Sequence, residues 1–346
     1  MRVDKNYCMS SFLTFRYIAD PEIVFAEGIE HTELKLVPDS EKIPCKTIDD
    51  IEHQIKESLK EIVPQKTALL LSGGIDSGIL ASYMPKGSVA YTVDSPAKVA
   101  KDEIKRAQRV CNQYGLEHRI VNVSWEDYDK SIDTLMKHDG CPVFANEPQV
   151  YTIAKQIQAD GFDTVVIGDS ADMAFGGMDR LLSRDWTFDE WVERYTFVKP
   201  EKVIRNPVSV LEVYERYRIG TNGVDYMKFL DEVFTISSSG AYVNSFDCLG
   251  LKYIDPYAAL KMAEPLDLQR VRSGDSKYML RELYRHRYPE FEVPEKIAMA
   301  RAVDVWLADW EGPQREEFIP NCIEGLTGEQ KFLIYSLERF LDIYGL

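Results

Sequence analysis

Short apolar runs alternate with amphipathic stretches over the first half of the chain. The runs lie at residues 67–71, 88–93, 118–123 and 164–167. Continuous apolar runs of this kind are typical of strands that are buried on both faces of a parallel sheet. Between and after them, apolar residues recur at helical spacing in the segments 75–83, 98–114, 125–137 and 148–161. This alternation predicts an α/β fold with a doubly wound parallel sheet.

The segments on either side follow different patterns. Residues 47–62 carry apolar residues at helical spacing and predict a connector helix. Residues 1 to about 45 hold short apolar stretches, at 12–15 and 23–25, and predict an arm with one or two short strands. From residue 186 onward, apolar and aromatic residues again recur at helical spacing. We therefore predict three parts: an arm and connector helix at 1–62, an α/β core at 63–185, and a mostly helical part at 186–346.

The composition is that of an ordinary globular protein with an acid excess. Of the 346 residues, 45% are hydrophobic and 28% are charged, and the formal net charge is −16. Because an acidic chain is repelled by phosphate backbones, we expect no nucleic-acid partner. No apolar run is long enough to span a bilayer, and the first residues lack the layout of a signal peptide, so we expect a cytoplasmic protein without a membrane partner. The six cysteines form no CxxC pair, which disfavours a zinc site and a disulfide framework.

The turn after the first apolar run holds the most informative residues. Ser72-Gly73-Gly74-Ile75-Asp76-Ser77 follows the run and precedes a predicted helix. Paired glycines let the backbone come close to a phosphate, and a helix N-terminus offers free N–H groups to it. The Asp76 carboxylate would repel a phosphate unless it holds Mg²⁺. No lysine follows the glycines, so this is not a Walker A loop. The alternative interpretation is a tight turn without a ligand.

This loop resembles the PP-loop of the N-type ATP pyrophosphatases. That superfamily includes asparagine synthetase, β-lactam synthetase and the GMP and NAD synthetases. The resemblance implies a doubly wound sheet of the adenine nucleotide alpha hydrolase-like class. It also implies that the protein uses ATP and Mg²⁺ to form an adenylate with release of pyrophosphate.

A second segment indicates which branch of this superfamily the chain resembles. Gly168-Asp169-Ser170-Ala171-Asp172 and the following Phe175-Gly176-Gly177 resemble the asparagine synthetase segment G-(E/D)-G-(S/A)-D-E-x-F-G-G-Y, although Ser170, Met173 and Met178 depart from it. By this resemblance Asp172 joins Asp76 as a ligand of Mg²⁺, and two carboxylates at neighbouring strand ends suit such a hard cation. Asp169 stands where asparagine synthetases carry an acidic residue and β-lactam synthetases a tyrosine. An acidic residue there would orient or deprotonate an attacking amine.

Two downstream lysines fall within segments that resemble the same branch. Lys277-Tyr278-Met279-Leu280-Arg281 resembles K-x-x-L-R, and Lys296 lies in a segment that resembles R-x-K-x-G-F…W-L. The resemblance implies that both lysines lie near the ATP phosphates. There they would neutralise the charge that develops as the adenylate forms. The structural alternative for each is an ordinary solvated lysine.

Two weaker resemblances extend over the rest of the chain. Residues 10–22 resemble the connector S-Y-L-x-F-G-Y-x-P-x-P that precedes the synthetase domain of asparagine synthetases. Within residues 244–257, Leu251-Lys252-Tyr253-Ile254-Asp255 resembles a variant of the segment E-x-R-x-P-F-L-D, in which Cys248 and Gly250 stand in place of its Glu and Arg. This departure counts against the Tyr–Glu dyad of the β-lactam synthetases.

Together these patterns predict an AMP- and pyrophosphate-forming ligase that joins a carboxylic acid to ammonia or an amine. The predicted catalytic residues are Lys296, Lys277 and Asp169, and the predicted Mg²⁺ ligands are Asp76 and Asp172. The predicted nucleotide-binding residues are Leu70, Ser72, Gly73, Gly74, Asp76, Ser77, Val93 and Gly168. Asparagine synthetases that use glutamine begin with a catalytic cysteine at position 2, where this chain has Arg2. We therefore expect no glutaminase activity, and a nitrogen source that is free ammonia, an amine or a separate amidotransferase partner.

Three other interpretations stay open. The first is an intramolecular amide-forming cyclase of the β-lactam or lasso-peptide synthetase type, which Asp169 and Cys248 disfavour. The second is a tRNA-modifying PP-loop enzyme, which the acidic charge disfavours. The third is a non-catalytic nucleotide-binding protein, which the presence of Asp76, Asp172 and Lys296 together disfavours.

Overall fold

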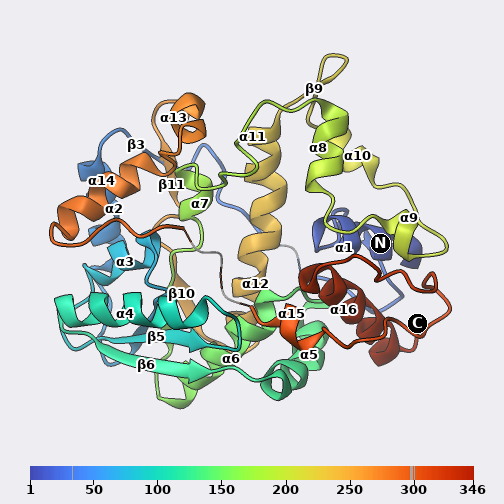
Figure 1. Ribbon diagram of the computed structural model, residues 1–346, viewed down its shortest axis with the longest axis horizontal. Coiled ribbons are helices and arrows are strands. Elements are labelled where there is room, and N and C mark those ends of the chain that lie inside the picture. The colour runs from blue at the N-terminus through green and yellow to red at the C-terminus, as the bar shows by residue number, and fades with distance from the viewer. Residues whose placement is uncertain (33, 297–298, 300) are drawn as a thin grey trace.

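A five-stranded parallel sheet forms the centre of one half of the molecule (Figure 1). The computed structural model describes residues 1–346 except 33, 297–298 and 300. The strands follow the order β10 (Lys252–Ile254), β7 (Thr164–Val166), β4 (Thr67–Leu70), β5 (Val89–Asp94) and β6 (Glu117–Asn122). Every neighbouring pair is parallel. The predicted fold class and the four predicted strands are therefore confirmed.

Helices cover both faces of this sheet. On one face, Leu69, Ala90 and Val166 pack against α2 (Ile48–Leu59), α3 (Ile75–Ala81), α4 (Ala100–Tyr114) and α14 (Tyr278–Arg287). On the other face, Ala68 and Val165 pack against α6 (Asn146–Ala159) and α12 (Thr235–Asp247). Successive strand residues thus point to opposite layers, as the pleat requires, and the continuous apolar runs are explained by burial on both sides.

Local signals fix where the predicted helices begin and end. Thr47 and Asp50 form a capping box at α2, and Ser124 and Asp127 form another at α5 (Trp125–Asp139), which packs on α6. Each box satisfies two backbone groups that would otherwise lack a partner at the helix start. Helix α4 ends at Gly115, whose φ of 66° is favourable only for glycine.

The other half of the molecule is built mainly from helices, and both termini lie in it (Figure 1). Its core is rich in aromatic side chains, among them Phe15, Trp191 and Phe332. Its helical elements are α1 (Lys5–Phe15), α8 (Phe188–Tyr195), α9 (Pro200–Val203), α10 (Leu211–Glu215), α11 (Tyr226–Phe229), the π-helical η1 (Leu230–Phe234), α15 (Val303–Trp306) and α16 (Gly328–Tyr344). The short helices α7 (Ala171–Ala174) and α13 (Leu268–Arg272) lie in the half that holds the sheet. Short strand pairs join β1 (Arg2–Val3) to β2 (Ile23–Val24), β3 (Ile43–Cys45) to β11 (Leu260–Met262), and β8 (Arg218–Ile219) to β9 (Gly223–Val224).

Two sequence expectations differ from the structure. The apolar stretch 12–15, expected as a strand, is the end of α1, whose start is capped by the Asp4 side chain. Every residue of that helix from Tyr7 to Phe15 is buried, so no polar face reveals the helical period in the sequence. The edge strand β10 was not expected, because it is only three residues long and belongs to a segment dominated by helices. The stretch 23–25 contains β2, as expected.

The order of the strands places the loops of interest at one crevice. From β4 the chain adds β5 and β6 on one side, and it then returns to place β7 on the opposite side of β4. The connections after β4 and β7 therefore diverge at their carboxyl ends, which is where open α/β sheets bind ligands. The turn at Ser72–Ser77 follows β4, and Gly168–Gly177 follows β7.

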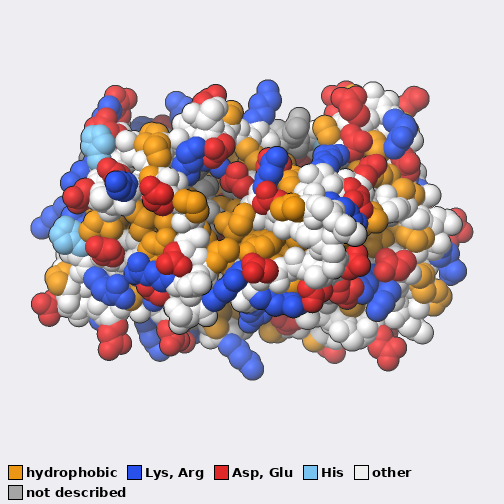
Figure 2. Space-filling view, turned by 90° about the horizontal axis from the view of Figure 1, so that it is seen from above, with side chains coloured by type: hydrophobic (Ala, Val, Ile, Leu, Met, Phe, Trp, Pro, Cys, Tyr) orange, Lys and Arg blue, Asp and Glu red, His pale blue; other side chains and the backbone are white. Residues whose placement is uncertain are grey.

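The described surface carries charges of both signs. On the face shown in Figure 2, acidic and basic side chains are interspersed, and hydrophobic side chains gather toward the centre. Among the described residues, no helix is both long enough and apolar enough for a membrane span.

Candidate active site

A cavity of about 420 Å³ lies at the crevice beside β4 and β7. The sequence-predicted residues that line it are Leu70, Ser72, Asp76, Ser77, Val93, Gly168, Asp169, Asp172 and Lys296. Lys277 lies behind them, 5% exposed, in contact with two of these carboxylates. Gly73 lies instead at a neighbouring hollow beside Arg106. Residues that are 226 positions apart in the sequence are thus brought to one site, although their roles remain predictions.

The Ser72–Ser77 turn is held in a single tight arrangement. The Ser77 hydroxyl accepts a hydrogen bond from the Ser72 backbone N–H at 3.2 Å, and the two hydroxyl oxygens are 3.1 Å apart. Gly73 has a φ of 72°, and a Cβ added there would lie 2.6 Å from the Ala107 backbone nitrogen. Only glycine fits this position. The turn therefore brings Ser72, Asp76 and Ser77 to the wall of the cavity, while Gly73 allows its close approach to α4.

Four charged side chains form a compact cluster beside this turn. The Lys277 ammonium contacts Asp76 Oδ2 at 2.6 Å and also contacts Asp172 Oδ1. The Lys296 ammonium donates to both oxygens of Asp172, each at 2.9 Å, and to the Gly177 carbonyl. A Cβ on Gly177 would lie 2.0 Å from Asp172 Oδ1 and 2.1 Å from Lys277 Cε. The absence of a side chain at Gly177 is therefore what lets this cluster close.

The cluster shifts the proton affinities of its members in opposite directions. Burial alone would raise the pKa of Asp172, but the Lys277 and Lys296 ammonium groups hold it below its usual range. Burial would likewise lower the pKa of Lys277, and the Asp76 and Asp172 carboxylates raise it above its usual range. Both groups are therefore charged at neutral pH. Burial raises the pKa of Asp76, with a smaller contribution from the Asp172 charge.

The same carboxylates fit a role in binding a hard cation. Asp76 Oδ1 is buried and has no hydrogen-bond partner among the described residues. An unpaired buried carboxylate oxygen is costly unless something binds it. In the described part of the chain, no group of three or more His, Cys, Asp or Glu residues could hold a metal ion. A site with two carboxylates is typical of Mg²⁺, which takes its remaining ligands from water and phosphate.

Asp169 lies between two cavities and is held by serines of α12. Its Oδ2 accepts a hydrogen bond from the Ser239 hydroxyl at 2.7 Å, and its Oδ1 accepts a longer one from Ser238 at 3.4 Å. It lines the 420 Å³ cavity and also a second one of about 270 Å³. Burial, followed by the nearby Asp255 charge, raises the pKa of Asp169 to about 7. A carboxylate with this pKa can accept and release a proton at neutral pH.

The structure adds residues that the sequence did not single out. Asp255 accepts hydrogen bonds from the backbone N–H groups of Ser170, at 2.9 Å, and Tyr257, at 3.0 Å, and so fixes the start of the Asp172 loop. Asp255 stands at the final Asp of the segment that resembles E-x-R-x-P-F-L-D. This resemblance was the one sequence signal that could have identified it as a site residue. Further lining residues come from distant elements and carried no signal; they include Arg16, Glu103, Asn146, Gln149 and Arg301.

The departures at Cys248 and Gly250 lie away from the cavity. Neither is among the described residues that line it. Cys248 ends α12, and Gly250, with a φ of 67°, belongs to the turn that leads into β10. The positions of the Glu and Arg in the segment E-x-R-x-P-F-L-D are therefore occupied here by residues of a structural turn.

Comparisons with known proteins were made against families, curated proteins and solved structures. Residues 50–222, half of the chain, match the family model described as asparagine synthase. No curated protein matches. One solved structure is the NH₃-dependent NAD synthetase from Campylobacter jejuni subsp. jejuni NCTC 11168, with 19% identity and a TM-score of 0.24 over 37% of this chain and 58% of that one. Another is NMN synthetase from Francisella tularensis, with 11% identity and a TM-score of 0.27 over 72% of this chain and 97% of that one.

Proposed function

The chain belongs to the asparagine synthase family of ATP-dependent, amide-forming ligases, and from this premise we propose the reaction that it performs. It activates a carboxylic acid as an acyl-adenylate, releases pyrophosphate, and transfers the acyl group to ammonia or an amine. The observation that carries this proposal is the cluster of Asp76, Asp172, Lys277 and Lys296 beside the Ser72–Ser77 turn.

ATP binds in the 420 Å³ cavity with its phosphates at the Ser72–Ser77 turn. The adenosine then lies toward the ends of β4 and β5, where Leu70 and Val93 line the same cavity. Asp76 and Asp172 would hold Mg²⁺, which when bound neutralises phosphate oxygens and polarises the α-phosphorus. Two observations support this assignment: Asp76 Oδ1 has no hydrogen-bond partner among the described residues, and Asp172 lies across the Lys277 ammonium from Asp76.

The two lysines balance the charge of the first step. The acid's carboxylate oxygen attacks the α-phosphorus, and the bond to the bridging oxygen breaks as pyrophosphate leaves. Lys277 is fixed between two carboxylates and holds them in place. Lys296 is 39% exposed at its side chain, so its ammonium can turn from Asp172 toward the departing oxygens. A preorganised cation at developing charge contributes about 10²–10³-fold to the rate.

Asp169 serves the second step. The nitrogen nucleophile attacks the acyl carbon and AMP departs, which leaves a proton to remove from nitrogen. With its pKa of about 7, Asp169 can accept this proton at neutral pH. Its serine partners Ser238 and Ser239 hold the carboxylate toward the cavity. The nitrogen source is ammonia, an amine or a separate amidotransferase partner. The assay that identifies the acid substrate, described below, also tests ammonium as the nitrogen source.

Two alternatives make different predictions. A cyclase would need no second nucleophile, and the structural turn at Cys248 and Gly250 disfavours its β-lactam form. A non-catalytic nucleotide-binding protein would bind ATP without releasing pyrophosphate. The closed charge cluster favours catalysis over simple binding, because it orders cations at the position where charge develops.

The test is pyrophosphate release from ATP and Mg²⁺ over a panel of carboxylic acids, with and without ammonium. The proposal expects release that requires an acid, gives amide only with a nitrogen source, and is lost in Asp76→Ala. Amide formation without any added nucleophile would indicate cyclisation. ATP binding without pyrophosphate release for every acid would overturn the proposal.

A further inference from the structure

A cavity of about 270 Å³ adjoins the nucleotide cavity, and Ile167, Asp169 and Tyr242 line both. Two neighbouring serines of α12 mark the two sides of this shared wall, since Ser238 lines the nucleotide cavity and Ser239 lines the 270 Å³ cavity. Asp169 accepts a hydrogen bond from Ser238 through Oδ1 and from Ser239 through Oδ2. The Asp169 carboxylate therefore stands at the boundary, with one oxygen bonded to the wall of each cavity.

Most of the side chains around the 270 Å³ cavity are apolar. They come from the segment 34–37, from α7, α11 and α12, and from the chain at β10 and β11. They include Val37, Met173, Met227 and Leu260. Ammonia has no apolar surface to bury, whereas an aliphatic chain or a ring gains free energy when such a wall removes it from water. The lining therefore fits an organic molecule better than a small polar one.

The cations around this cavity lie at its outer end. Lys42 pairs with Asp231 at 2.7 Å, and Lys261 pairs with Asp39 at 2.7 Å. The Asp39 side chain is 71% exposed, which places these pairs on the solvent side. Lys35 is exposed as well. The lysines that line the cavity are thus either paired with carboxylates or in contact with water.

The inner end holds two buried carboxylates that have no cationic partner. Asp169 is hydrogen-bonded by hydroxyls and Asp255 by backbone N–H groups, and neither forms an ion pair with any described residue. Burial raises the pKa of both, to about 7 for Asp169 and about 6 for Asp255, so each is at least partly ionised at neutral pH. A buried charge without a partner is costly. An ammonium group at this end of the cavity would supply the missing positive charge.

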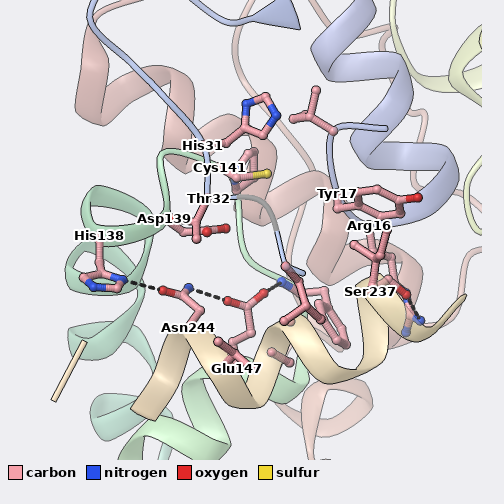
Figure 3. A pocket seen from close by; sticks show the side chains of 18 of the residues that line it. Arg16, Tyr17, His31, Thr32, His138, Asp139, Cys141, Glu147, Ser237 and Asn244 are labelled. Atoms are coloured by element: carbon pink, nitrogen blue, oxygen red, sulfur yellow. Dashed lines mark hydrogen bonds between the residues drawn. The ribbon is translucent and has the colours of Figure 1, made fainter. Parts of the chain in front are cut away.

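A neighbouring cavity of about 360 Å³ differs in both respects (Figure 3). Arg16 lies at one end of it, and the hydrogen-bonded chain of His138, Asn244 and Glu147 runs along the other. The Arg16 guanidinium repels an ammonium group. Asp169 is not among the described residues that line this cavity. The 270 Å³ cavity is therefore the one that suits an amine.

We propose that the 270 Å³ cavity binds the nitrogen substrate, and that this substrate is a primary organic amine with an apolar side chain. Its nitrogen lies at Asp169, and its apolar part lies against the wall that includes Val37, Met227 and Leu260. This inference rests on the proposed function for the chemical step, but its account of amine binding does not depend on that step.

The shared position of Asp169 allows a balanced reaction. The amine enters as its ammonium ion, is held by the ionised Asp169, and loses one proton to solvent. Its lone pair then forms the C–N bond to the acyl carbon as the C–O bond to AMP breaks, and AMP leaves with the electrons of that bond. Asp169 accepts the second proton from nitrogen. The acyl-adenylate in one cavity and the amine in the other thus meet at a residue that both cavities share.

Ala258 offers a substitution that fills the 270 Å³ cavity alone. It lines this cavity and is not among the described residues that line the nucleotide cavity. It is half-buried in the turn between β10 and β11, so we expect Ala258→Leu to fold. Ala259 is the matched control, because it is the next residue, is equally half-buried, and is not among the described residues that line either cavity. Thermal unfolding followed by circular dichroism checks that both variants are folded.

The experiment measures amide formation with ammonium, methylamine, isobutylamine and benzylamine, each at the same concentration of free base. The acid is the one that supports pyrophosphate release, and mass spectrometry identifies the amide. We expect wild type to use isobutylamine or benzylamine with a kcat/KM at least about 10-fold above that for ammonium. Relative to Ala259→Leu, Ala258→Leu should lose about 10–100-fold in kcat/KM for the preferred amine, and much less for ammonium, because the added side chain fills the space of the apolar group.

Two further measurements separate amine binding from the rest of the reaction. Saturation-transfer NMR follows isobutylamine and benzylamine with the protein, Mg²⁺ and α,β-methylene-ATP. We expect a signal from the preferred amine with wild type and Ala259→Leu, and its loss with Ala258→Leu. ATP–pyrophosphate exchange in the absence of amine reports on the acid alone, and it shows whether the acid, and not the amine, occupies the 270 Å³ cavity.

Each outcome bears on a different claim. Preference of wild type for ammonium over every amine, or equal effects of Ala258→Leu and Ala259→Leu on all amines, would overturn the amine site and leave the ligase function intact. Slower exchange in Ala258→Leu than in Ala259→Leu would place the acid in this cavity and would also overturn it. Amine binding that Ala258→Leu removes, without pyrophosphate release for any acid, would support the amine site and overturn the proposed function. Neither binding nor release would overturn both.

Discussion

Gly177→Ala tests whether the charge cluster is as closely packed as the structure shows. The new Cβ would lie 2.0 Å from Asp172 Oδ1 and 2.1 Å from Lys277 Cε, distances that real Cβ atoms do not show. Gly177 does not have a positive φ, so the effect is steric and not a backbone penalty. The carboxylate or the lysine must move, and Lys277 is 5% exposed, with little space to do so.

The expected loss of unfolding free energy in Gly177→Ala follows from two contributions. Overpacking a filled site costs about 1–3 kcal/mol. Breaking a fully buried ion pair costs about 3–5 kcal/mol, but Asp172 is 30% exposed at its side chain and regains some hydration, so only part of that applies. We expect the free energy of unfolding to fall by about 2–4 kcal/mol and adenylation to be lost.

The matched control is Gly240→Ala in α12. A Cβ there meets nothing within 4 Å, and the residue is inside a helix. The same change should therefore raise the free energy of unfolding, by about 0.5–1 kcal/mol. Urea unfolding of both variants, followed by circular dichroism, measures the two values. A Gly177→Ala protein as stable as Gly240→Ala would refute the packing of the cluster.

Further predictions concern the steps of the reaction. Asp169→Asn should keep acid-dependent ATP–pyrophosphate exchange and lose about 10²–10⁴-fold in amide formation, whereas equal loss in both assays would place Asp169 in the first step. In wild type, amide formation at constant free-amine concentration should rise with pH and level off above about 7, since Asp169 acts in its ionised form, and this rise should vanish in Asp169→Asn. Lys296→Met should slow pyrophosphate release about 10²–10³-fold and change the free energy of unfolding by less than about 1 kcal/mol, because the side chain is half-exposed. Chelation of Mg²⁺ should abolish pyrophosphate release, and its return should restore it; release that persists without the cation would contradict the roles of Asp76 and Asp172.

The sequence predicted the sheet and the turn because both are local signals. A buried parallel strand is a continuous apolar run, and the turn after β4 requires glycine at a fixed position, as the 72° φ of Gly73 shows. The four predicted strands of the sheet agree with the structure. The β10 strand was missed because its three residues are too few to show a period. The burial of α1 on all sides likewise removed the pattern that marks a helix.

The candidate site could be predicted only where a residue lay within a recognisable segment. Asp76, Asp169 and Asp172 follow strands, and the structure places them at one cavity. Lys277 lies between Asp76 and Asp172 because α14 packs against α3. No local sequence pattern encodes this packing, so the position of Lys277 could not be predicted from the sequence. That Arg16 would line the same cavity could not be predicted either, because its guanidinium is held among aromatic rings contributed by residues 144, 197 and 234. The cytoplasmic location and the three-part division of the chain remain predictions.

The central claim is that the acid is activated as an acyl-adenylate, and oxygen transfer tests it most directly. The acid that supports pyrophosphate release is labelled with ¹⁸O in its carboxylate and allowed to react with ATP and the nitrogen source. The proposed reaction predicts one ¹⁸O atom in each AMP and none in pyrophosphate, because the carboxylate oxygen that attacks the α-phosphorus stays with it. AMP without label, or label in pyrophosphate or inorganic phosphate, would contradict the account.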